Sequence, residues 1–274
     1  MLVLIDTEIH PINFCNHNID ERNEIMPDFK EIKLDEAKHL INANHLIESK
    51  IDGCCMEWKN QEFRSERNCE RSDRFPHIIK ELKSLPWNVQ GEIAIPFGNV
   101  FSVSRKANWH KAKLYLFGIS EYDGSEVVGN PLEIRKELER LVGKNFKHIT
   151  LPFKWDDFSK AWRWVKKHEV EGLVFKSLIG GIDFKLKDWK EFKVPVIGHT
   201  AGLQKGSFQI ACESGAVSSV SATSVEYVDR YNHLVASGKA VWMEGECLFL
   251  TDEGKPFQPR IRRIDVKSEI LKVA

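Results

Sequence analysis

Residues 49–53 have the sequence Ser49-Lys50-Ile51-Asp52-Gly53, in which a lysine is followed, after one spacer, by an acid and a glycine. A lysine ammonium is not nucleophilic, but burial or a neighbouring cation lowers its pKa and yields an amine that can attack phosphorus. The same letters also fit a solvated lysine that enters a turn, because Asp-Gly is a strong turn dipeptide. Taken alone, the stretch favours the turn, since short patterns often match by chance.

The composition is that of an ordinary globular protein. With 274 residues, the chain suits one large domain or two smaller ones and can bury a real core. Hydrophobic residues make up 42% and charged residues 29%, which excludes a disordered or fibrous class. Lys plus Arg and Asp plus Glu are each 40. Net charge therefore does not indicate a nucleic-acid partner, although a neutral chain can still carry one basic face.

The sequence contains no targeting or disulfide pattern. The opening residues 1–6 lack the basic region of a signal peptide and are too short for its apolar region. No apolar run approaches a membrane span. The six cysteines include the neighbours Cys54 and Cys55 but no CxxC pair, which argues against a disulfide framework and a structural zinc site. We expect an intracellular, reducing location with no membrane association.

Hydrophobic periodicity predicts the elements of the first 190 residues or so. Helical spacing occurs at 34–41, where Asp35 is the expected cap, at 78–85, at 131–141 and at 156–168. The third of these helices should begin after Asn130 and end at Gly143. Strands are expected at 46–50, with 56–58 returning as its partner, and at 89–95, 114–119, 170–175 and 184–187.

Three of these strands carry chemically interesting side chains. Glu92 lies on a strand among apolar neighbours, and Phe117 should share a strand face with Ile119. The alternation in 184–187 places Lys185 and Lys187 on one face. Two adjacent lysines repel unless an anion lies between them, so this arrangement suits a phosphate.

The pattern changes beyond about residue 190. Residues 194–198, 207–212, 217–222 and 240–250 have strand character, and a helix is expected at 224–236. Several short strands and one helix within about 80 residues fit a small barrel of the OB type, a common nucleic-acid platform. We place the domain boundary near Trp189-Lys190, which gives domains 1–189 and 190–274.

In sequence order, these signals resemble the motifs of the covalent nucleotidyltransferases and, among them, those of the small ATP-dependent DNA ligases. The matching stretches are Lys50-Ile51-Asp52-Gly53, Gly91-Glu92-Ile93, Leu114-Tyr115-Leu116-Phe117, Glu171-Gly172-Leu173-Val174 and Lys185-Leu186-Lys187. Further similar stretches are Arg67-Asn68, Phe75-Pro76, Leu85-Pro86, residues 251–256 and Pro259-Arg260. The resemblance covers roughly residues 46–267. Five motifs in the family's order are far less probable by chance than one, so the functional interpretation of Lys50 replaces the turn.

The resemblance implies an α+β fold and a specific reaction. A nucleotidyltransferase domain of antiparallel sheets with flanking helices would be followed by a C-terminal OB-fold β-barrel. Lys50 would attack the α-phosphate of ATP and form a lysyl-adenylate, the AMP would pass to the 5′-phosphate at a nick in duplex DNA, and the 3′-hydroxyl would displace AMP. Each step is an in-line displacement at phosphorus, which needs positioning and charge stabilisation. We expect a monomer whose partner is nicked double-stranded DNA.

The resemblance also implies individual roles. Lys185 and Lys187 would neutralise the α-phosphate, and their field would help to keep Lys50 uncharged. Phe117 would stack on adenine. Glu92 and Glu171 would bind the ribose or a Mg²⁺ ion, and two metal ions would act at successive steps. The residues expected to bind ATP are Lys50, Asp52, Arg67, Glu92, Phe117, Glu171, Lys185 and Lys187.

Basic residues outside these motifs are candidates for phosphate contacts. The cluster near the C-terminus would orient pyrophosphate or contact the DNA backbone, and a solvated tail is the alternative. The DNA-binding candidates are Arg64, Arg67, Arg260, Arg262, Arg263 and Lys267.

The chain departs from the ligase pattern at several positions. Cys55 stands where an arginine is usual, and Gln90 and Gly118 each stand where an aspartate is usual. The stretch 171–185 is too short for the usual Gly-Arg pair. Arg64, Arg67 or Lys176 would have to supply the missing phosphate contacts.

Other functions remain open on the sequence alone. An RNA ligase, or an RNA-capping guanylyltransferase, would use the same lysine on another substrate. A non-catalytic nucleic-acid-binding protein could keep the fold, but it has no need of the lysines and glutamates together. The alternatives to the individual roles are that Phe117 is a core residue and that Glu92 and Glu171 are ordinary surface carboxylates. Residues 1–45 have no assigned role.

Overall fold

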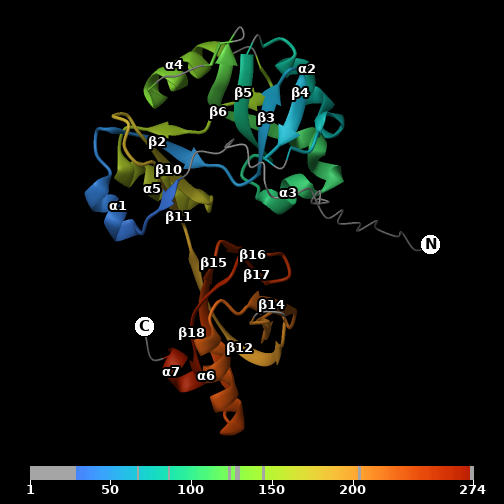
Figure 1. The fold of residues 1–274 in the computed structure, drawn as a ribbon, viewed down its shortest axis with the longest axis vertical. Coiled ribbons are helices and arrows are strands. Elements are labelled where there is room, and N and C mark those ends of the chain that lie inside the picture. The colour runs from blue at the N-terminus through green and yellow to red at the C-terminus, as the bar shows by residue number, and fades with distance from the viewer. Residues whose placement is uncertain are drawn as a thin grey trace, which may run out of the picture. The chain divides into compact units, whose positions relative to one another are not determined.

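The chain divides into two compact units, over residues Met1–Lys187 and Asp188–Ala274. This computed structural model describes residues 29–66, 68–85, 87–122, 125–126, 130–143, 146–202 and 205–271 (Figure 1). Each unit is mixed in secondary structure, and the sheets are mostly antiparallel. Within the described ranges, no helix is long and apolar enough to cross a membrane.

The first sheet of the first unit carries the candidate reactive lysine. Its five strands lie in the order β1-β11-β10-β2-β9. Their bounds are Lys30–Glu31 (β1), His45–Lys50 (β2), Lys154–Trp155 (β9), Gly172–Ser177 (β10) and Phe184–Lys187 (β11). Helices α1 (Leu34–Leu40) and α5 (Phe158–His168) contribute to its core, in which Ala37, Val165 and Phe175 are fully buried. The N-cap of α1 is Lys33, so the expectation of Asp35 was wrong by two residues.

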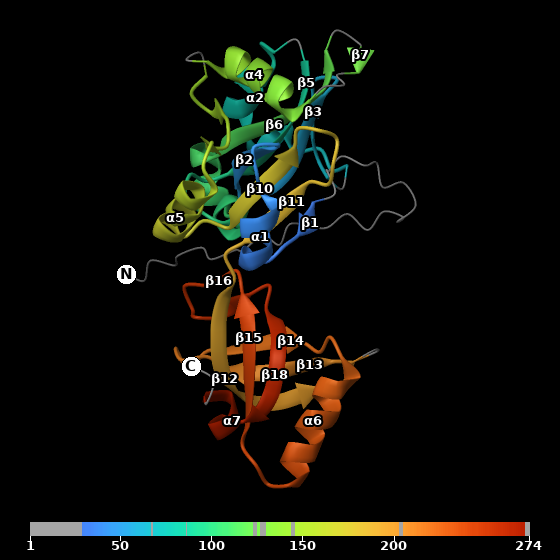
Figure 2. The same cartoon turned by 90° about the vertical axis from the view of Figure 1, so that its left-hand side faces the viewer.

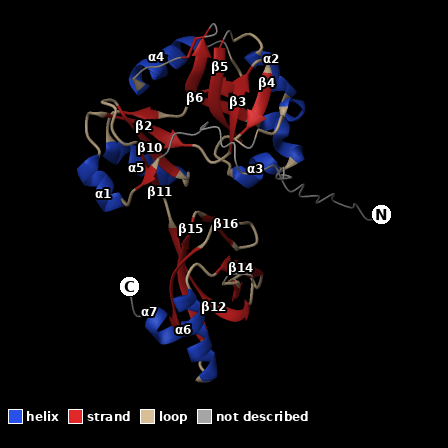
Figure 3. Ribbon diagram, viewed as in Figure 1, coloured by secondary structure: helices blue, strands red, loops and turns tan. Residues whose placement is uncertain are grey.

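The second sheet lies beside the first in the same unit, as Figures 1 and 2 both show. Its strands are ordered β4-β3-β5-β6-β7, with β8 paired to β6. Their bounds are Cys54–Lys59 (β3), Glu62–Ser65 (β4), Trp87–Ala94 (β5), Lys113–Tyr122 (β6), Ser125–Glu126 (β7) and Ile149–Thr150 (β8). The helices are η1 (Ser72–Arg74), α2 (Pro76–Leu82), α3 (Val100–Ser104), η2 (Lys106–Lys111) and α4 (Pro131–Val142), as coloured in Figure 3.

The prediction that 56–58 pairs with the strand of Lys50 was wrong. Strand β3 pairs with β4 and β5, whereas β2 pairs with β10 and β9. Residues 51–53 therefore connect two different sheets, and the Asp-Gly dipeptide does not close a hairpin. Periodicity specifies the face of a strand but not its neighbour, which explains the error.

Strand β6 contains an irregularity at the predicted adenine-stacking residue. Gln90 pairs with Gly118 and Gly91 pairs with Leu116, so Phe117 is the extra residue of a β-bulge. Beyond the bulge the alternation shifts, and Ile119 enters the core together with Leu116. The prediction that Ile119 shares the face of Phe117 was therefore wrong, because a bulge changes which side chains point inward.

The second unit is an antiparallel sheet with two helices. Its strand order is β14-β13-β12-β15-β18, beside a two-stranded hairpin of β16 and β17. The strands are Lys190–Thr200 (β12), Ser207–Ala211 (β13), Val217–Ser221 (β14), Val241–Cys247 (β15), Phe249–Leu250 (β16), Pro256–Phe257 (β17) and Arg260–Val266 (β18), and the helices are α6 (Val225–Ala236) and α7 (Lys267–Leu271). Strands β14 and β18 end the order without a pairing between them in the described part of the chain, so the expected closed OB barrel is not confirmed.

Candidate functional site

Strand register brings Lys50 at the end of β2, Glu171 just before β10 and Lys187 at the end of β11 together in one sheet. Gly172 at the start of β10 pairs with Lys50 at the end of β2 on one side and with Lys187 at the end of β11 on the other. Glu171 precedes Gly172 and lies between the two lysines. Its Oε2 is 2.7 Å from Lys50 Nζ, and its Oε1 is 2.9 Å from Lys187 Nζ. Residues more than one hundred positions apart in the chain thus form one ion-paired group.

Two glycines of the recognised motifs are needed for this approach. A Cβ on Gly172 would lie 1.9 Å from Leu186 O, so only glycine lets β10 run this close to β11. A Cβ on Gly53 would lie 2.1 Å from Ile93 O. The chain leaving Lys50 therefore passes directly against β5, which carries Glu92.

Asp52 and Glu92 add two further carboxyl groups beside Lys50. Burial raises the pKa of Glu92 to about 8; the Lys50 charge lowers it, and the charges of Glu171 and Asp52 raise it further. Burial and the charge of Glu171 raise the pKa of Asp52 to about 6. Burial without enough neighbouring positive charge disfavours the ionised form of both carboxyl groups. An added cation would therefore interact favourably with them.

The charge on Lys50 differs from the expectation. Burial lowers its pKa, but Glu171, Glu92 and Asp52 outweigh burial and raise the pKa above the ordinary lysine value. The expectation that the lysines of β11 keep Lys50 uncharged is therefore wrong for the protein alone. Glu171 Oε2 lies only 2.7 Å from Lys50 Nζ, so the carboxylate field dominates the protonation state.

Those carboxyl groups suit a hard divalent cation by chemistry, since oxygen ligands are the ones that Mg²⁺ prefers. Among the described residues, no three His, Cys, Asp or Glu side chains are already grouped around a common point as a metal site. Glu171 is held by two lysines, and Glu92 is the acid whose pKa is raised most. The residues therefore fit a cation that arrives already bound to phosphate oxygens. They do not form a complete set of metal ligands in advance.

Phe117 is attached to a buried ion network that the sequence analysis missed. Lys176 Nζ donates to Phe117 O at 3.0 Å and lies 5.7 Å from the Phe117 ring centre. The same ammonium is 2.8 Å from Glu48 Oε2, and Arg135 Nη1 is 2.5 Å from Glu48 Oε1. Glu48 is 1% and Arg135 is 7% exposed. The only sign of this network in the sequence is one charged residue among the apolar positions of β2, Glu48, and one on the inner face of α4, Arg135.

The replacements expected for the missing arginine are mostly engaged elsewhere. Cys55 pairs with Glu92 across β3 and β5, and burial raises the pKa of its thiol, so it supplies no positive charge. Lys176 belongs to the network of Glu48. Arg64 is paired with Glu62 at 2.6 Å. Arg67 lies outside the described residues.

Of the three motif lysines Lys50, Lys185 and Lys187, Lys185 is the one whose ammonium has no ion pair among the described residues. It lies on β11 opposite Val174 of β10. Within the described ranges no ion pair holds its ammonium, in contrast to Lys50 and Lys187. Lys185 therefore remains the simplest partner for an incoming phosphate.

The basic residues of the second unit are held by local partners. Arg262 is 2.6 Å from Glu191 and 2.5 Å from Glu246. The Arg260 guanidinium lies 3.9 Å from the Trp189 ring centre, and the Lys267 ammonium lies 4.8 Å from that of Trp242. Arg263 donates to the Glu269 carbonyl. These contacts make them residues of β18 and α7 with defined structural partners, not members of a solvated tail.

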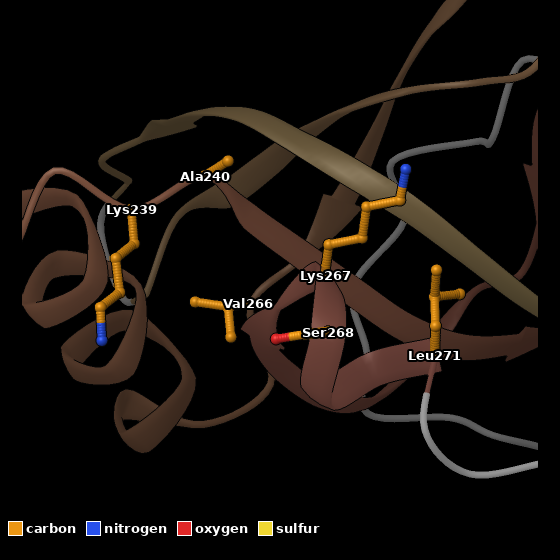
Figure 4. Close-up of a pocket in the computed structure, with 6 residues that line it drawn as sticks. All are labelled: Lys239, Ala240, Val266, Lys267, Ser268 and Leu271. Carbon is orange, nitrogen blue, oxygen red and sulfur yellow. The ribbon is translucent and has the colours of Figure 1, made fainter.

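Lys267 also lines a shallow hollow of the second unit (Figure 4). The lining residues are Lys239, Ala240, Val266, Lys267, Ser268 and Leu271. The two lysines extend away from one another in Figure 4. None of these lining residues is a carboxylate, so the hollow lacks the paired lysines and carboxyl groups found around Lys50.

The fold is that of ATP-dependent DNA ligases. No protein-family model matches the chain, and no curated protein matches it. The similar solved structures include one described as "DNA binding with a minimal scaffold: Structure-function analysis of Lig E DNA ligases", with a TM-score of 0.61 and 16% identity, over 88% of this chain and 100% of that one. Another is the ligase domain of LigD from M. tuberculosis, with a TM-score of 0.50 and 18% identity, over 89% and 98%. A third, designated Pmar-Lig_Pre, has a TM-score of 0.65 and 17% identity over 87% of this chain, which spans 66% of its length.

Proposed function

We propose that this protein is an ATP-dependent DNA ligase that seals 5′-phosphate, 3′-hydroxyl nicks in duplex DNA through a lysyl-AMP intermediate. The observation that carries the proposal is the convergence of Lys50, Glu171 and Lys187 in a chain with the ligase fold. A structural ion pair needs one lysine and one carboxylate. A group of two lysines and three carboxyl groups, in which the pKa values of Glu92 and Asp52 are raised, is typical of a reactive site.

In the first step, Lys50 Nζ forms a bond to the α-phosphorus of ATP and pyrophosphate leaves. Lys50 must first lose a proton, which its ion pair with Glu171 opposes. A divalent cation, when bound by Glu92 and Glu171, would supply positive charge that neutralises phosphate oxygens and reduces the hold of these carboxylates on Lys50. Lys185 and Lys187 would place their charges on the α-phosphate, and Phe117 would stack on adenine.

In the second and third steps, the AMP moves from Lys50 to the 5′-phosphate of the nick, and the 3′-hydroxyl then displaces AMP. The same lysines serve each step, because every transition state carries charge at one phosphorus. We assign the second unit to the OB type, which its five antiparallel strands and helix α6 support. Its role would be to contact the DNA backbone. We expect the enzyme to act inside the cell as a monomer.

The first test is covalent labelling. Wild-type protein incubated with α-labelled ATP and Mg²⁺ should retain the label, and Lys50→Ala should abolish it. Lys80→Ala, which removes an exposed lysine of α2, is the matched control and should label as wild type does. A wild-type protein that takes no label would sink the proposal. Labelling by GTP in place of ATP would redirect it to RNA capping.

The second test compares substrates at equal concentration. Pre-adenylated protein is given nicked duplexes in which both strands at the nick are DNA, one is RNA, or both are RNA, and the rate of sealing is measured for each. We expect the all-DNA nick to be sealed fastest. Faster sealing of RNA would refute the DNA assignment and support an RNA ligase with the same adenylation chemistry.

A further inference from the structure

The first unit carries a group of aromatic rings at its surface that the proposed reaction does not use. We call it the aromatic platform, and it consists of Phe97, Phe153, Trp155, Trp164 and His168. Neighbouring ring centres are between 4.6 and 6.4 Å apart. Phe97 is 67% and Phe153 is 52% exposed. Trp155, Trp164 and His168, which lie between these two rings, are half-buried. Exposed apolar groups gathered in this way mark an interaction site more often than single exposed residues do.

The platform is built from three separate segments. Trp164 and His168 lie four residues apart on α5 and so share one helix face, next to the buried stripe of Ala161 and Val165. Figure 2 shows α5 at the margin of the first unit. Phe97 reaches the platform from the loop after β5 with a φ of 55°. A bulky residue rarely adopts this left-handed conformation, and such strain is usually kept where it serves a function.

The helix under the platform is basic. Residues 158–168 contain Lys160, Arg163, Lys166, Lys167 and His168 and no acid. Lys160 and Lys167 lie one turn before and after Trp164, on the same side of the helix. In the part of the chain that the structure describes, no ion pair occupies Lys160, Arg163 or Lys167, and all three are exposed. This differs from the basic residues of β18, which have carboxylate or aromatic partners.

The platform is joined to the candidate active site through its backbone. Phe153 N donates to Ser49 Oγ at 3.0 Å, and Ser49 N donates to Phe153 O at 2.9 Å. Ser49 directly precedes Lys50. A ligand on the platform would therefore lie next to the strand that ends in the reactive lysine.

We propose that the aromatic platform binds the unpaired nucleotides of a single DNA strand. This proposal rests on the proposed function and extends the substrate of the enzyme to nicks with an adjoining single-stranded segment. Bases would stack on Phe153, Phe97 and Trp164, and phosphates would contact Lys160, Arg163 and Lys167. Exposed rings beside unneutralised cations are the combination that binds single strands without sequence preference. A duplex would not suit the rings, because its bases are already stacked on one another.

The test is fluorescence anisotropy of a labelled 20-nucleotide oligothymidine with the full chain, without ATP or Mg²⁺. Phe153→Ala should raise the dissociation constant about tenfold, in line with the loss of one stacked base. Phe153→Leu should behave like alanine and Phe153→Trp like wild type, since stacking needs an aromatic face. Phe101→Ala, at an exposed ring of α3, is the control and should have no effect.

The charge contribution is measured through salt. Lys160→Gln combined with Lys167→Gln should reduce the slope of log affinity against log salt by about 1.4, at about 0.7 per phosphate contact of a single strand. Lys80→Gln with Lys136→Gln, on α2 and α4, removes the same charge and should leave the slope unchanged.

Three outcomes would overturn the platform: binding that ignores Phe153, a slope equally affected by both lysine pairs, or sedimentation showing that Phe153 mediates self-association in place of oligonucleotide binding. These outcomes do not depend on adenylation, because the assay contains no ATP. A protein that binds the oligonucleotide through Phe153 but takes no label from ATP would overturn the proposed function. One that takes the label but binds without Phe153 would overturn the platform alone.

Discussion

Two groups of charged residues in this molecule have opposite character. Around Lys50, three carboxyl groups and two lysines are crowded together, and the pKa values of Glu92, Asp52 and Lys50 are all raised. On β18, each cation has a nearby partner, as Arg262 has in Glu191 and Glu246. Both groups were candidates on sequence, but only the first holds carboxyl groups, Glu92 and Asp52, whose negative charge is in an unfavourable environment.

This difference separates reactive charge from structural charge. An exposed ion pair contributes little free energy and carries out no chemistry. Crowded, part-buried groups cost stability in the free protein, and a ligand that balances their charge recovers that cost. The following changes test the distinction, from the largest expected effect to the smallest.

Glu171→Gln should have the largest effect, because Glu171 contacts both Lys50 and Lys187. We expect the rate of lysyl-AMP formation to fall about 100-fold through loss of positioning. Removal of the carboxylate charge should also lower the pKa of Lys50, so the pH at which the rate is half-maximal should decrease. Single-turnover labelling from pH 6 to 10 measures both.

The control for this change is Glu169→Gln, at an exposed acid two residues earlier. It should alter neither the rate nor the pH midpoint. An unchanged midpoint in Glu171→Gln would contradict the assignment of Glu171 as the carboxylate that holds the Lys50 proton.

Arg135→Met should destabilise the first unit by about 3 to 5 kcal/mol, the usual cost of breaking a buried ion pair from one side. It leaves Glu48 with Lys176 as its remaining charged partner. Thermal unfolding followed by circular dichroism measures the change, with Lys136→Met at an exposed neighbour on α4 as the control. Combining Arg135→Met with Glu48→Gln should recover part of the loss. No recovery would show that the two residues are not coupled.

Glu92→Gln should remove a pH-dependent loss of stability. The pKa of Glu92 is about 8 in the folded protein and near 4.3 in an unfolded chain. Between these values the folded state binds more protons, so wild-type stability falls as the pH rises through this window. The variant should melt a few degrees above wild type at pH 8.5, and the gap should close at pH 5. A gap that stays constant with pH, as expected for the control Glu66→Gln, would disprove the raised pKa.

Arg262→Gln should have the smallest effect. Its ion pairs with Glu191 and Glu246 are at the surface, so their loss should cost below about 1 kcal/mol. Labelling of Lys50 by ATP should be unchanged within twofold. A large loss of nick sealing at unchanged stability would instead give Arg262 a direct role on DNA and weaken the contrast between the two groups.

Much of the fold was accessible from local patterns. The helices at α1, α2, α4 and α5, and the strand carrying Glu92, lie within a few residues of where periodicity predicts them, and Asn130 caps α4 as expected, because these signals depend on neighbours within one or two turns. The order of five short motifs indicated the ligase fold. Lys185 and Lys187 share a strand face because alternation requires it.

The remainder depends on contacts between distant segments. Periodicity does not specify strand neighbours, so the pairing of β3 was mispredicted, and the bulge at Phe117 was not foreseen. The buried pair of Arg135 and Glu48 joins residues 87 positions apart. Its sequence signal was only a charge within an apolar pattern, which has no meaning until its partner is known.

The sequence by itself determined which residues can act: a lysine nucleophile, carboxyl groups, a stacking ring and two lysines for a phosphate. Only the tertiary structure decided their state. The proximity of Glu171, Glu92 and Asp52 outweighs burial and makes Lys50 a protonated, ion-paired lysine, contrary to the free amine that the neighbouring lysines suggested. Charge interactions depend on distance and on the surrounding dielectric, and neither is written in the order of residues.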